Sequence, residues 1–388
     1  MSEARSSIPV VCVFYTNRDF GKAERLQKVR RKEDVQTCPL FQRVSLLQTR
    51  QLNDQVYLLE QGDMCKDWCE ANCVHHVRLD DRVAQKRFQW LHERVPGLKG
   101  MNTEFTYAYA RMWHLLELAE SRGWDRFAFN DGDVMTYTSA AHMIAHFEDQ
   151  GQELAYCMYW PRANNLFSIF TVDSMRDMIA FAEAAWDEGI SFGGAGDMKW
   201  IFLYGLAGTP KEDWQCWAKN DLEDVPGFTR LRGPECVEAL NPKGKNIIPE
   251  KFVPKFRVGN PCASWDNGVE SGGDFQRDRT GVVETHEGGQ PKVYWLRGLP
   301  FYKRRDTDQL VRLWSHHFQG ASKLLQGVFS RRYTPDCIRR YPAYCECRTC
   351  RCEECQVEGC SLADGEVAAS RKGGVARLLD WRGTQAVC

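Results

Sequence analysis

The sequence has no long hydrophobic run and no excess of either charge. No stretch approaches the ~18 consecutive apolar residues of a membrane-spanning helix, and the apolar run "VVCVFY" near the N-terminus is too short for a signal sequence. The 51 Lys+Arg and 52 Asp+Glu residues nearly cancel, which argues against a nucleic acid partner and a polybasic membrane-binding surface. We therefore expect a soluble protein without a transmembrane segment, cytoplasmic by default.

Internal repeats are also lacking. The 388 residues are 43 % hydrophobic and 12 % aromatic, which is typical of a chain with a packed core. After about residue 332 the sequence becomes rich in cysteine and then in Gly, Ala and Arg, without helical or strand periodicity. We predict a folded domain over residues 8–332 and an irregular, cysteine-rich tail over residues 333–388.

Predicted strands and helices alternate through the first half of the chain. This order indicates an α/β fold with a Rossmann-like, mostly parallel sheet and helices on both faces, in which ligands bind outside the carboxyl ends of the strands. Residues 207–285 are predicted to form long loops, before a strand and turn in "PKVYWLRGLPFY". The predicted strands are "VVCVFYT", "NDQVYLLEQ", "CVHHVRLDD", "WDRFAFN" and "ELAYCMYW". The predicted helices are "KAERLQKVRRKED", "TEFTYAYARMWHLLELAESRG" closed by Gly123, "SAAHMIAHFED" with Ser139 as N-cap, "DSMRDMIAFAEAAWDEG" and "GDMKWIFLYG".

Two carboxylates, Asp131 and Asp133, stand one glycine apart directly after a predicted buried strand. Such a pair raises the pKa of both groups unless a cation compensates, and a divalent ion with oxygen ligands is the natural partner. Gly132 would let the backbone turn tightly between them. The alternative is a β-turn with the aspartates as turn formers. The second Asp-x-Asp pair, Asp306 and Asp308, stands in a charged stretch predicted to open a helix, and we interpret it as structural.

A second cluster of chemically useful residues lies in "HHFQGASK". His317 offers an imidazole ligand at a strand end, and Phe318 would anchor that strand. Gly320 permits close backbone approach, and Lys323 one helical turn further could face an anion. A carboxylate pair, an imidazole and a lysine suit a metal-bound diphosphate. The alternative is that His316 and His317 are ordinary strand residues and that Lys323 is a solvated surface charge.

"HFQGASK" resembles the His-Phe-x-Gly-x-x-Lys signature of the retaining glycogenin-type and bacterial galactosyltransferase group of nucleotide-diphospho-sugar transferases, which have the GT-A fold. In that group this histidine and an Asp-x-Asp (DxD) motif jointly bind manganese on a nucleotide-sugar. The resemblance implies that Asp131, Asp133 and His317 bind Mn²⁺ or Mg²⁺. It also implies that Asp131, Gly320 and Lys323 contact the donor.

Three further segments follow in the order of the family. "FYTNRDF" is similar to the first-strand segment that receives the nucleoside, which implicates Thr16 and Asn17. "YARMWHLLEL" resembles the helix whose basic residue, here Arg111, would neutralise the departing diphosphate together with the lysine of the signature. "GGAGDMKWIF" implicates Asp197 as the residue that contacts the transferred sugar, although capping of its helix is an alternative role.

The resemblance covers residues 8 to about 330, with two departures. Asn130 and aromatic residues precede the carboxylates where the family has an aliphatic run, and "LLQG" replaces the proline-tryptophan that often follows the lysine.

Cysteine is abundant but unevenly placed. Seven of the 17 cysteines lie between Cys337 and Cys360, and three lie in "CKDWCEANC". Without a predicted leader, such clusters favour metal binding or free thiols over a disulfide framework. In "YCECRTCRCEECQVEGC" the two Cys-x-x-Cys pairs are one residue apart, which is poor geometry for a single zinc ribbon. A small Zn²⁺ cluster, a disordered or oxidised tail and local disulfides all stay open.

These observations predict a metal-dependent, hexosyltransferase-type enzyme. It would move a sugar from a nucleoside-diphosphate sugar, most simply a UDP-sugar, to a hydroxyl of a glycan, protein or small-molecule acceptor, with retention of configuration. One alternative is a non-catalytic GT-A-like binding or scaffold protein whose tail binds zinc. The other is a sugar nucleotidyltransferase, for which "YTNRDFGKAERL" is a poor version of the expected Gly-rich, basic phosphate loop.

Overall fold

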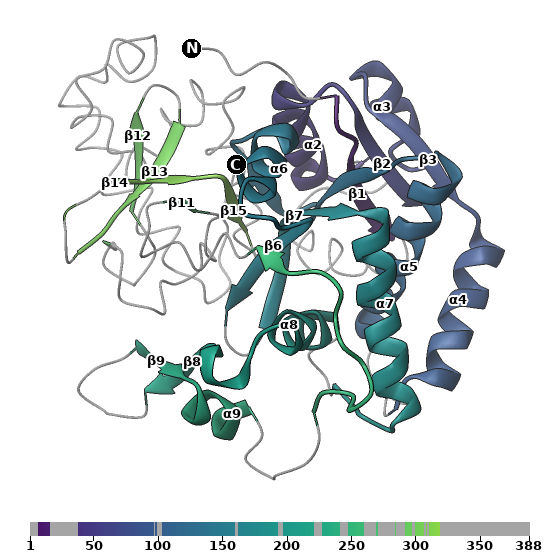
Figure 1. Ribbon diagram of the computed structural model, residues 1–388. Helices are drawn as coiled ribbons and strands as arrows, with labels where there is room; N and C mark the ends of the chain where they lie inside the picture. The colour runs from purple at the N-terminus through teal and green to yellow at the C-terminus, as the bar shows by residue number, and fades with distance from the viewer. Residues whose placement is uncertain are drawn as a thin grey trace, which may run out of the picture.

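A seven-stranded sheet forms the centre of the protein, in the order β10-β6-β7-β4-β1-β2-β3 (Figure 1). Its strands run parallel except β7, which is antiparallel to both β4 and β6. The predicted α/β fold with a mostly parallel sheet is therefore confirmed. The strands are β1 Val10–Tyr15, β2 Val56–Gln61, β3 His75–Leu79, β4 Arg126–Asn130, β6 Leu154–Tyr159, β7 Arg162–Thr171 and β10 Val258–Gly259. The structure is a computed structural model that describes residues 7–15, 38–96, 98, 103–159, 162–192, 197–220, 227–240, 247–259, 269–270, 284, 292–296, 299–305, 308 and 310–318.

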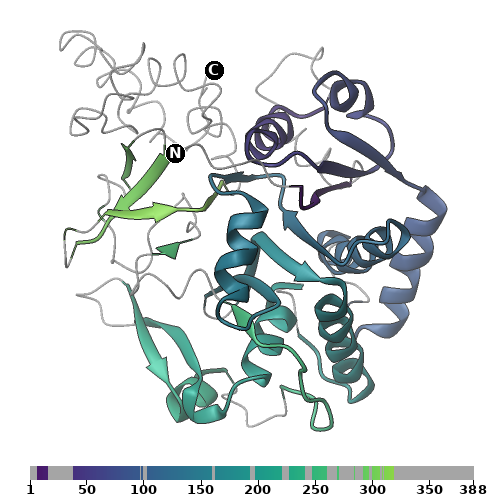
Figure 2. The same cartoon turned by 45° about the horizontal axis from the view of Figure 1, so that its top comes forward.

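Helices cover both faces of this sheet, as Figures 1 and 2 show from two directions. Strand β1 shows the reason, because alternate residues of a strand point to opposite faces. Val11, Val13 and Tyr15 belong to the large core under α4, α5, α7 and α8. Cys12 and Phe14 belong to a second core under α2 and α3. The helices are α2 Leu40–Leu52, α3 Lys66–Ala71, α4 Asp81–Arg94, α5 Thr103–Ser121, α6 Ala140–Glu148, α7 Val172–Asp187 and α8 Asp197–Ala207.

Two of the predicted helix boundaries are confirmed. The hydroxyl of Ser139 accepts a hydrogen bond from the backbone N–H of His142 at 3.2 Å, so it caps α6. Gly123 follows α5 with a φ of 63°, a left-handed conformation that favours glycine at helix C-termini.

The prediction of long loops over residues 207–285 is wrong in part. This region contains the antiparallel hairpin of β8 Gln215–Asn220 and β9 Gly227–Arg232, followed by helix α9 Pro234–Leu240. The strands carry many polar residues and lack the apolar period that signals a strand. Their backbone hydrogen bonds come from pairing with each other, which neither segment reveals alone.

A smaller sheet in the order β11-β14-β13-β12 lies beside the main sheet in Figure 1. The second Asp-x-Asp pair precedes one of its strands, so the predicted helix at that point is wrong. Asp308 is exposed, and its carboxylate lies 2.8 Å from the Lys303 ammonium, while Asp306 is outside the described residues. These strands are β11 Val269–Glu270, β12 Val293–Leu296, β13 Leu299–Lys303 and β14 Leu310–Leu313.

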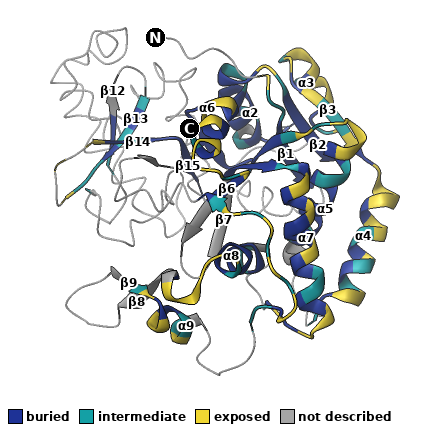
Figure 3. Cartoon of the chain, in the orientation of Figure 1, coloured by how far each residue is buried: buried dark blue, intermediate teal, exposed yellow. Residues whose placement is uncertain are grey.

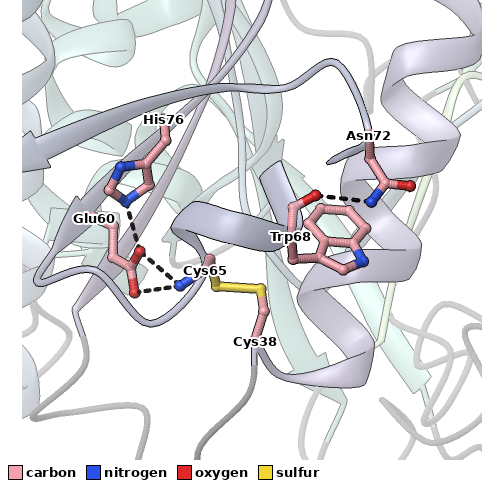
Figure 4. The surroundings of a disulfide bond; sticks show 6 residues. All are labelled: Cys38, Glu60, Cys65, Trp68, Asn72 and His76. Carbon is pink, nitrogen blue, oxygen red and sulfur yellow. Dashed lines mark hydrogen bonds and ion pairs between the residues drawn. A yellow bond between two sulfur atoms is a disulfide. The ribbon is translucent and has the colours of Figure 1, made fainter. Parts of the chain in front are cut away.

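The expectation of free or metal-binding cysteines in the N-terminal half is also wrong for one pair. Cys38 and Cys65 form a disulfide between the start of α2 and the start of α3 (Figure 4). Cys236 is disulfide-bonded as well. Cys69 is a buried thiol and Cys73 an exposed one. The motif "CKDWCEANC" does not indicate the disulfide, because the partner of Cys65 lies 27 residues earlier in the sequence.

Burial follows the layers of the fold. The central strands are buried, and the outer helices expose their far sides, as α4 does in Figure 3. Among the helices in the described part of the chain, none combines the length and apolarity needed to cross a bilayer.

Candidate functional site

The two predicted metal-binding aspartates lie in a tight turn between β4 and the short strand β5 Val134–Thr136. The backbone N–H of Val134 donates to the carbonyl of Asp131 at 2.9 Å, and Asp131 Oδ1 accepts from the N–H of Gly132 at 2.9 Å. The segment is therefore a β-turn, as the alternative interpretation stated. The other contacts of the carboxylates show that turn formation is not their whole role.

The Asp131 carboxylate is paired with Arg111 of α5. Arg111 Nη1 lies 2.9 Å from Asp131 Oδ2, and the guanidinium lies 5.1 Å from the centroid of the Phe129 ring. The Arg111 side chain is 9 % exposed and that of Asp131 is 33 % exposed. A largely buried cation beside a partly exposed carboxylate places positive charge where an anionic ligand could reach it from solvent.

The Asp133 carboxylate is next to His317 because strand β15 Ser315–His317 pairs antiparallel with β5. In this register His317 lies opposite Val134, and the N–H of Phe318 donates to the Asp133 carbonyl at 2.8 Å. His317 Nε2 is 3.4 Å from Asp133 Oδ1, and both side chains are largely buried. The structure thus brings together two motifs that are far apart in the sequence.

This group of residues lies at the carboxyl edge of the main sheet. Strands β1 and β4 are parallel neighbours, so Tyr15 and Asn130 end at the same edge. The other predicted site residues are described incompletely or not at all. Asp197 is seen only as the first residue of α8, and Thr16, Asn17, Gly320 and Lys323 lie outside the described residues.

The chemical types of these side chains suit a hard divalent ion, because two carboxylates and an imidazole are ligands that Mn²⁺ accepts. Within the described residues, however, no group of three or more His, Cys, Asp or Glu side chains is arranged to hold a metal ion. Asp131 faces Arg111, whereas Asp133 faces His317.

Sequence reasoning missed a second polar contact at this edge. The Tyr15 hydroxyl and His114 Nδ1 of α5 are 2.9 Å apart, and both residues are buried. Burial and, to a smaller extent, the Arg87 guanidinium lower the pKa of His114 to about 3, so the imidazole is neutral at pH 7. Helical spacing could have revealed it, since His114 follows Arg111 by three residues on α5.

No protein-family model matches the sequence, and no curated protein matches it. Solved structures to which the chain is similar include mouse xyloside xylosyltransferase 1, with a TM-score of 0.36 and 11 % identity over 51 % of this chain and 81 % of that one. An active-site mutant of LgtC has a TM-score of 0.30 and 12 % identity over 51 % of this chain and 70 % of that one. A cytidylyltransferase from Leptospira borgpetersenii has a TM-score of 0.28 and 11 % identity, over 45 % of this chain and 65 % of that one. Nucleotide-diphospho-sugar transferases, the group that the sequence motifs resemble, are therefore among the structures found. The assignment of an α/β fold follows from the strand order itself.

Proposed function

We propose that this protein is a divalent-metal-dependent glycosyltransferase of the GT-A type. It would transfer a hexosyl group from a UDP-sugar to an acceptor hydroxyl with retention of configuration. The observation that supports this most is the meeting of Asp131, Asp133, Arg111 and His317 at the carboxyl edge of the parallel strands. Ligands of open α/β sheets bind at that edge.

Each residue of the group has a distinct role in this proposal. Asp131, Asp133 and His317 would hold Mn²⁺ or Mg²⁺, which when bound offsets negative charge on the diphosphate. Arg111 lies beside Asp131 at 2.9 Å. In this proposal the Arg111 guanidinium would bind the departing diphosphate. A nearly buried guanidinium is effective here, because electrostatic interactions strengthen where water is excluded.

The remaining assignments come from the sequence motifs. Thr16 and Asn17 would contact the nucleoside, and Gly320 and Lys323 the diphosphate. Asp197 would orient the transferred sugar or stabilise positive charge on its anomeric carbon. Zinc in the cysteine-rich tail is also a proposal, as is the acceptor, which is a glycan, a protein or a small molecule.

A donor panel tests the proposal. Release of nucleoside diphosphate from several UDP- and GDP-sugars is measured with and without Mn²⁺, for the wild type and for Asp133→Asn. We expect Mn²⁺-dependent hydrolysis that falls by at least ~100-fold in the variant, because a ligand to the ion is lost. The matched control is Asp308→Asn, which alters an exposed aspartate of the other Asp-x-Asp pair and should leave the rate unchanged.

The other outcomes separate the alternatives. Metal-independent hydrolysis that is unchanged in Asp133→Asn would contradict the proposed mechanism. Formation of a nucleotide-sugar from a nucleoside triphosphate and a sugar 1-phosphate would indicate a nucleotidyltransferase. Mn²⁺-dependent binding of donor without turnover would indicate a binding protein.

A further inference from the structure

Helix α2 buries a polar face in addition to apolar residues such as Leu46. Gln42, Ser45, Gln48 and Thr49 recur at helical spacing, and each is at most 1 % exposed. Helices usually bury an apolar stripe, because a buried polar group destabilises the fold unless it is hydrogen-bonded. A polar face that is buried so completely therefore requires specific partners.

The partners of Ser45 and Gln48 belong to strand β5, which follows the two aspartates. The Ser45 hydroxyl donates to the carbonyl of Val134 at 2.7 Å, and the Gln48 side-chain amide donates to the carbonyl of Thr136 at 3.0 Å. On its other edge β5 pairs with β15. Backbone groups of successive strand residues point to alternate edges, so α2 satisfies the carbonyls that a further strand would otherwise bind. The helix takes the place of a neighbouring strand.

The same helix holds the residue that precedes the aspartates. Asn130 is the last residue of β4 and is fully buried. Its side-chain amide donates to the hydroxyls of Ser45 at 3.2 Å and Thr49 at 3.1 Å. Asn130 is one of the departures from the aliphatic pattern of the family. In this protein the Asn130 side chain is hydrogen-bonded to the polar face of α2. The chain is therefore bonded to the helix before the turn, at Asn130, and after it, at Val134.

Gln42 contacts the middle of the turn. A Cβ atom added to Gly132 would lie 2.0 Å from Gln42 Oε1 and 2.9 Å from Gln42 Cδ, which is impossible without movement. Gly132 lies in the predicted tight turn, but its φ is not in the left-handed region, so the turn conformation alone does not call for glycine. The Gln42 carboxamide occupies the space of a side chain at position 132, so any larger residue there would require Gln42 to move.

We propose that α2 is the positioning element of the carboxylate turn, with Ser45 and Asn130 as positioning residues and with the Gln42 carboxamide packed against Gly132. The helix fixes the turn before, within and after the two aspartates, and thereby sets the separation at which their carboxylates approach an ion. Its effect on Mn²⁺ affinity rests on the proposed function. Its effect on the order of the turn does not.

A steric rescue tests this proposal. Gly132→Ala should weaken Mn²⁺ binding by ~10- to 100-fold, measured by electron paramagnetic resonance of free Mn²⁺, because groups that orient metal ligands have effects of this size. It should also speed hydrogen exchange of the amides of residues 131–136. Adding Gln42→Ala should restore both properties to within ~3-fold of the wild type, since it removes the atoms that the new methyl group meets. The control is Gly208→Ala, whose Cβ would lie no closer than 3.6 Å to any neighbour.

A second pair of variants tests the hydrogen bonds. Ser45→Ala removes the donor to the Val134 carbonyl, and Ser121→Ala removes a similar bond to the Leu118 carbonyl at the end of α5. Only Ser45→Ala should speed exchange in residues 131–136 and weaken Mn²⁺ binding. In the donor assay it should lower the apparent Mn²⁺ affinity more than the rate at saturating Mn²⁺.

The outcomes distinguish this proposal from the proposed function. If the wild type binds no Mn²⁺ and hydrolyses no donor, the proposed function is wrong, and hydrogen exchange alone decides the role of α2. If Gly132→Ala exchanges like the wild type, or if Gln42→Ala fails to rescue it, α2 does not position the turn. Equal effects of Ser45→Ala and Ser121→Ala would lead to the same conclusion.

Discussion

His114 lies one turn after Arg111 on α5 and is buried against the end of β1. Its pKa falls from 6.5 to about 3 through burial and the nearby Arg87. Below pH 6.5 the unfolded chain therefore takes up a proton that the native protein does not. The free energy of unfolding decreases as the pH falls from 6.5 toward 3. At pH 5 the loss is about 2 kcal/mol relative to pH 7.5.

The measurement is urea unfolding at pH 7.5, 6 and 5. His114→Gln should reduce the pH dependence by roughly this amount at pH 5. Part of the dependence should remain, because burial and the adjacent His317 lower the pKa of His316 to about 3 as well. His142→Gln, at an exposed position, serves as the control. A pH dependence that is unchanged in His114→Gln would show that the native fold does not lower the pKa of this imidazole.

At the scale of single residues, the sequence predicted which motif residues would lie together better than it predicted packing. The aspartates, Arg111 and His317 could be predicted because short motifs carry them, and the structure places them together. The reason for Gly132 could not, because it depends on Gln42, which is far away in the chain. A glycine after an aspartate indicates a turn in any sequence. Only the tertiary structure shows that a side chain distant in sequence occupies the space where a Cβ atom at position 132 would lie.

At the scale of elements, helix α6 shows what a local signal can predict. Ser139 caps it, and a second acceptor, Asn53 Oδ1, receives the N–H of Ala140 at 2.9 Å. Ser139→Ala should lower the free energy of unfolding by about 1 kcal/mol, because the N–H of His142 loses its capping partner. Urea denaturation measures the loss. Ser121→Ala, at an exposed position in α5, should have a smaller effect, and an equal effect would argue against capping.

Helix α2 shows where a local signal fails. Its segment "LFQRVSLLQTRQL" buries both polar residues, such as Gln48, and apolar residues, such as Leu46. The sequence prediction did not include this helix. Its stability depends on carbonyls of a strand that comes much later in the chain. An element whose partners are specific hydrogen bonds is not visible in a pattern of hydrophobic residues.

At the scale of the whole molecule, the candidate site is assembled from distant parts of the chain. The strand that carries His317 comes after the small sheet, and it pairs with β5 directly behind the aspartates. The alternation of strands and helices predicted the main sheet, because βαβ units are local in sequence. It did not predict the β15–β5 pairing, since long-range antiparallel contacts leave no periodic signal.

The disulfide is a second long-range constraint, and its surroundings predict that it persists in the native protein. Cys38 and Cys65 are almost completely buried. The Glu60 carboxylate accepts hydrogen bonds from the N–H of Cys65, at 3.0 and 3.2 Å, and lies 2.7 Å from His76 Nε2 (Figure 4). Burial raises the pKa of the neighbouring Cys69 thiol to about 12, so it carries no thiolate that could attack the bond at pH 7.

Native protein alkylated without reductant should therefore yield a peptide pair linked through Cys38 and Cys65 in mass spectrometry. Replacing both cysteines by alanine should lower the free energy of unfolding by about 3 kcal/mol, because the bridge restrains a loop of intermediate length in the unfolded chain. Cys73→Ala, which removes an exposed free thiol, should leave stability unchanged. Disulfides form in oxidising compartments. Recovery of both cysteines in alkylated form would contradict the bridge and would agree with the cytoplasmic location expected from the sequence.

Because the bridge is attached at the start of α2, the double variant should also loosen the carboxylate turn, which hydrogen exchange of residues 131–136 would detect.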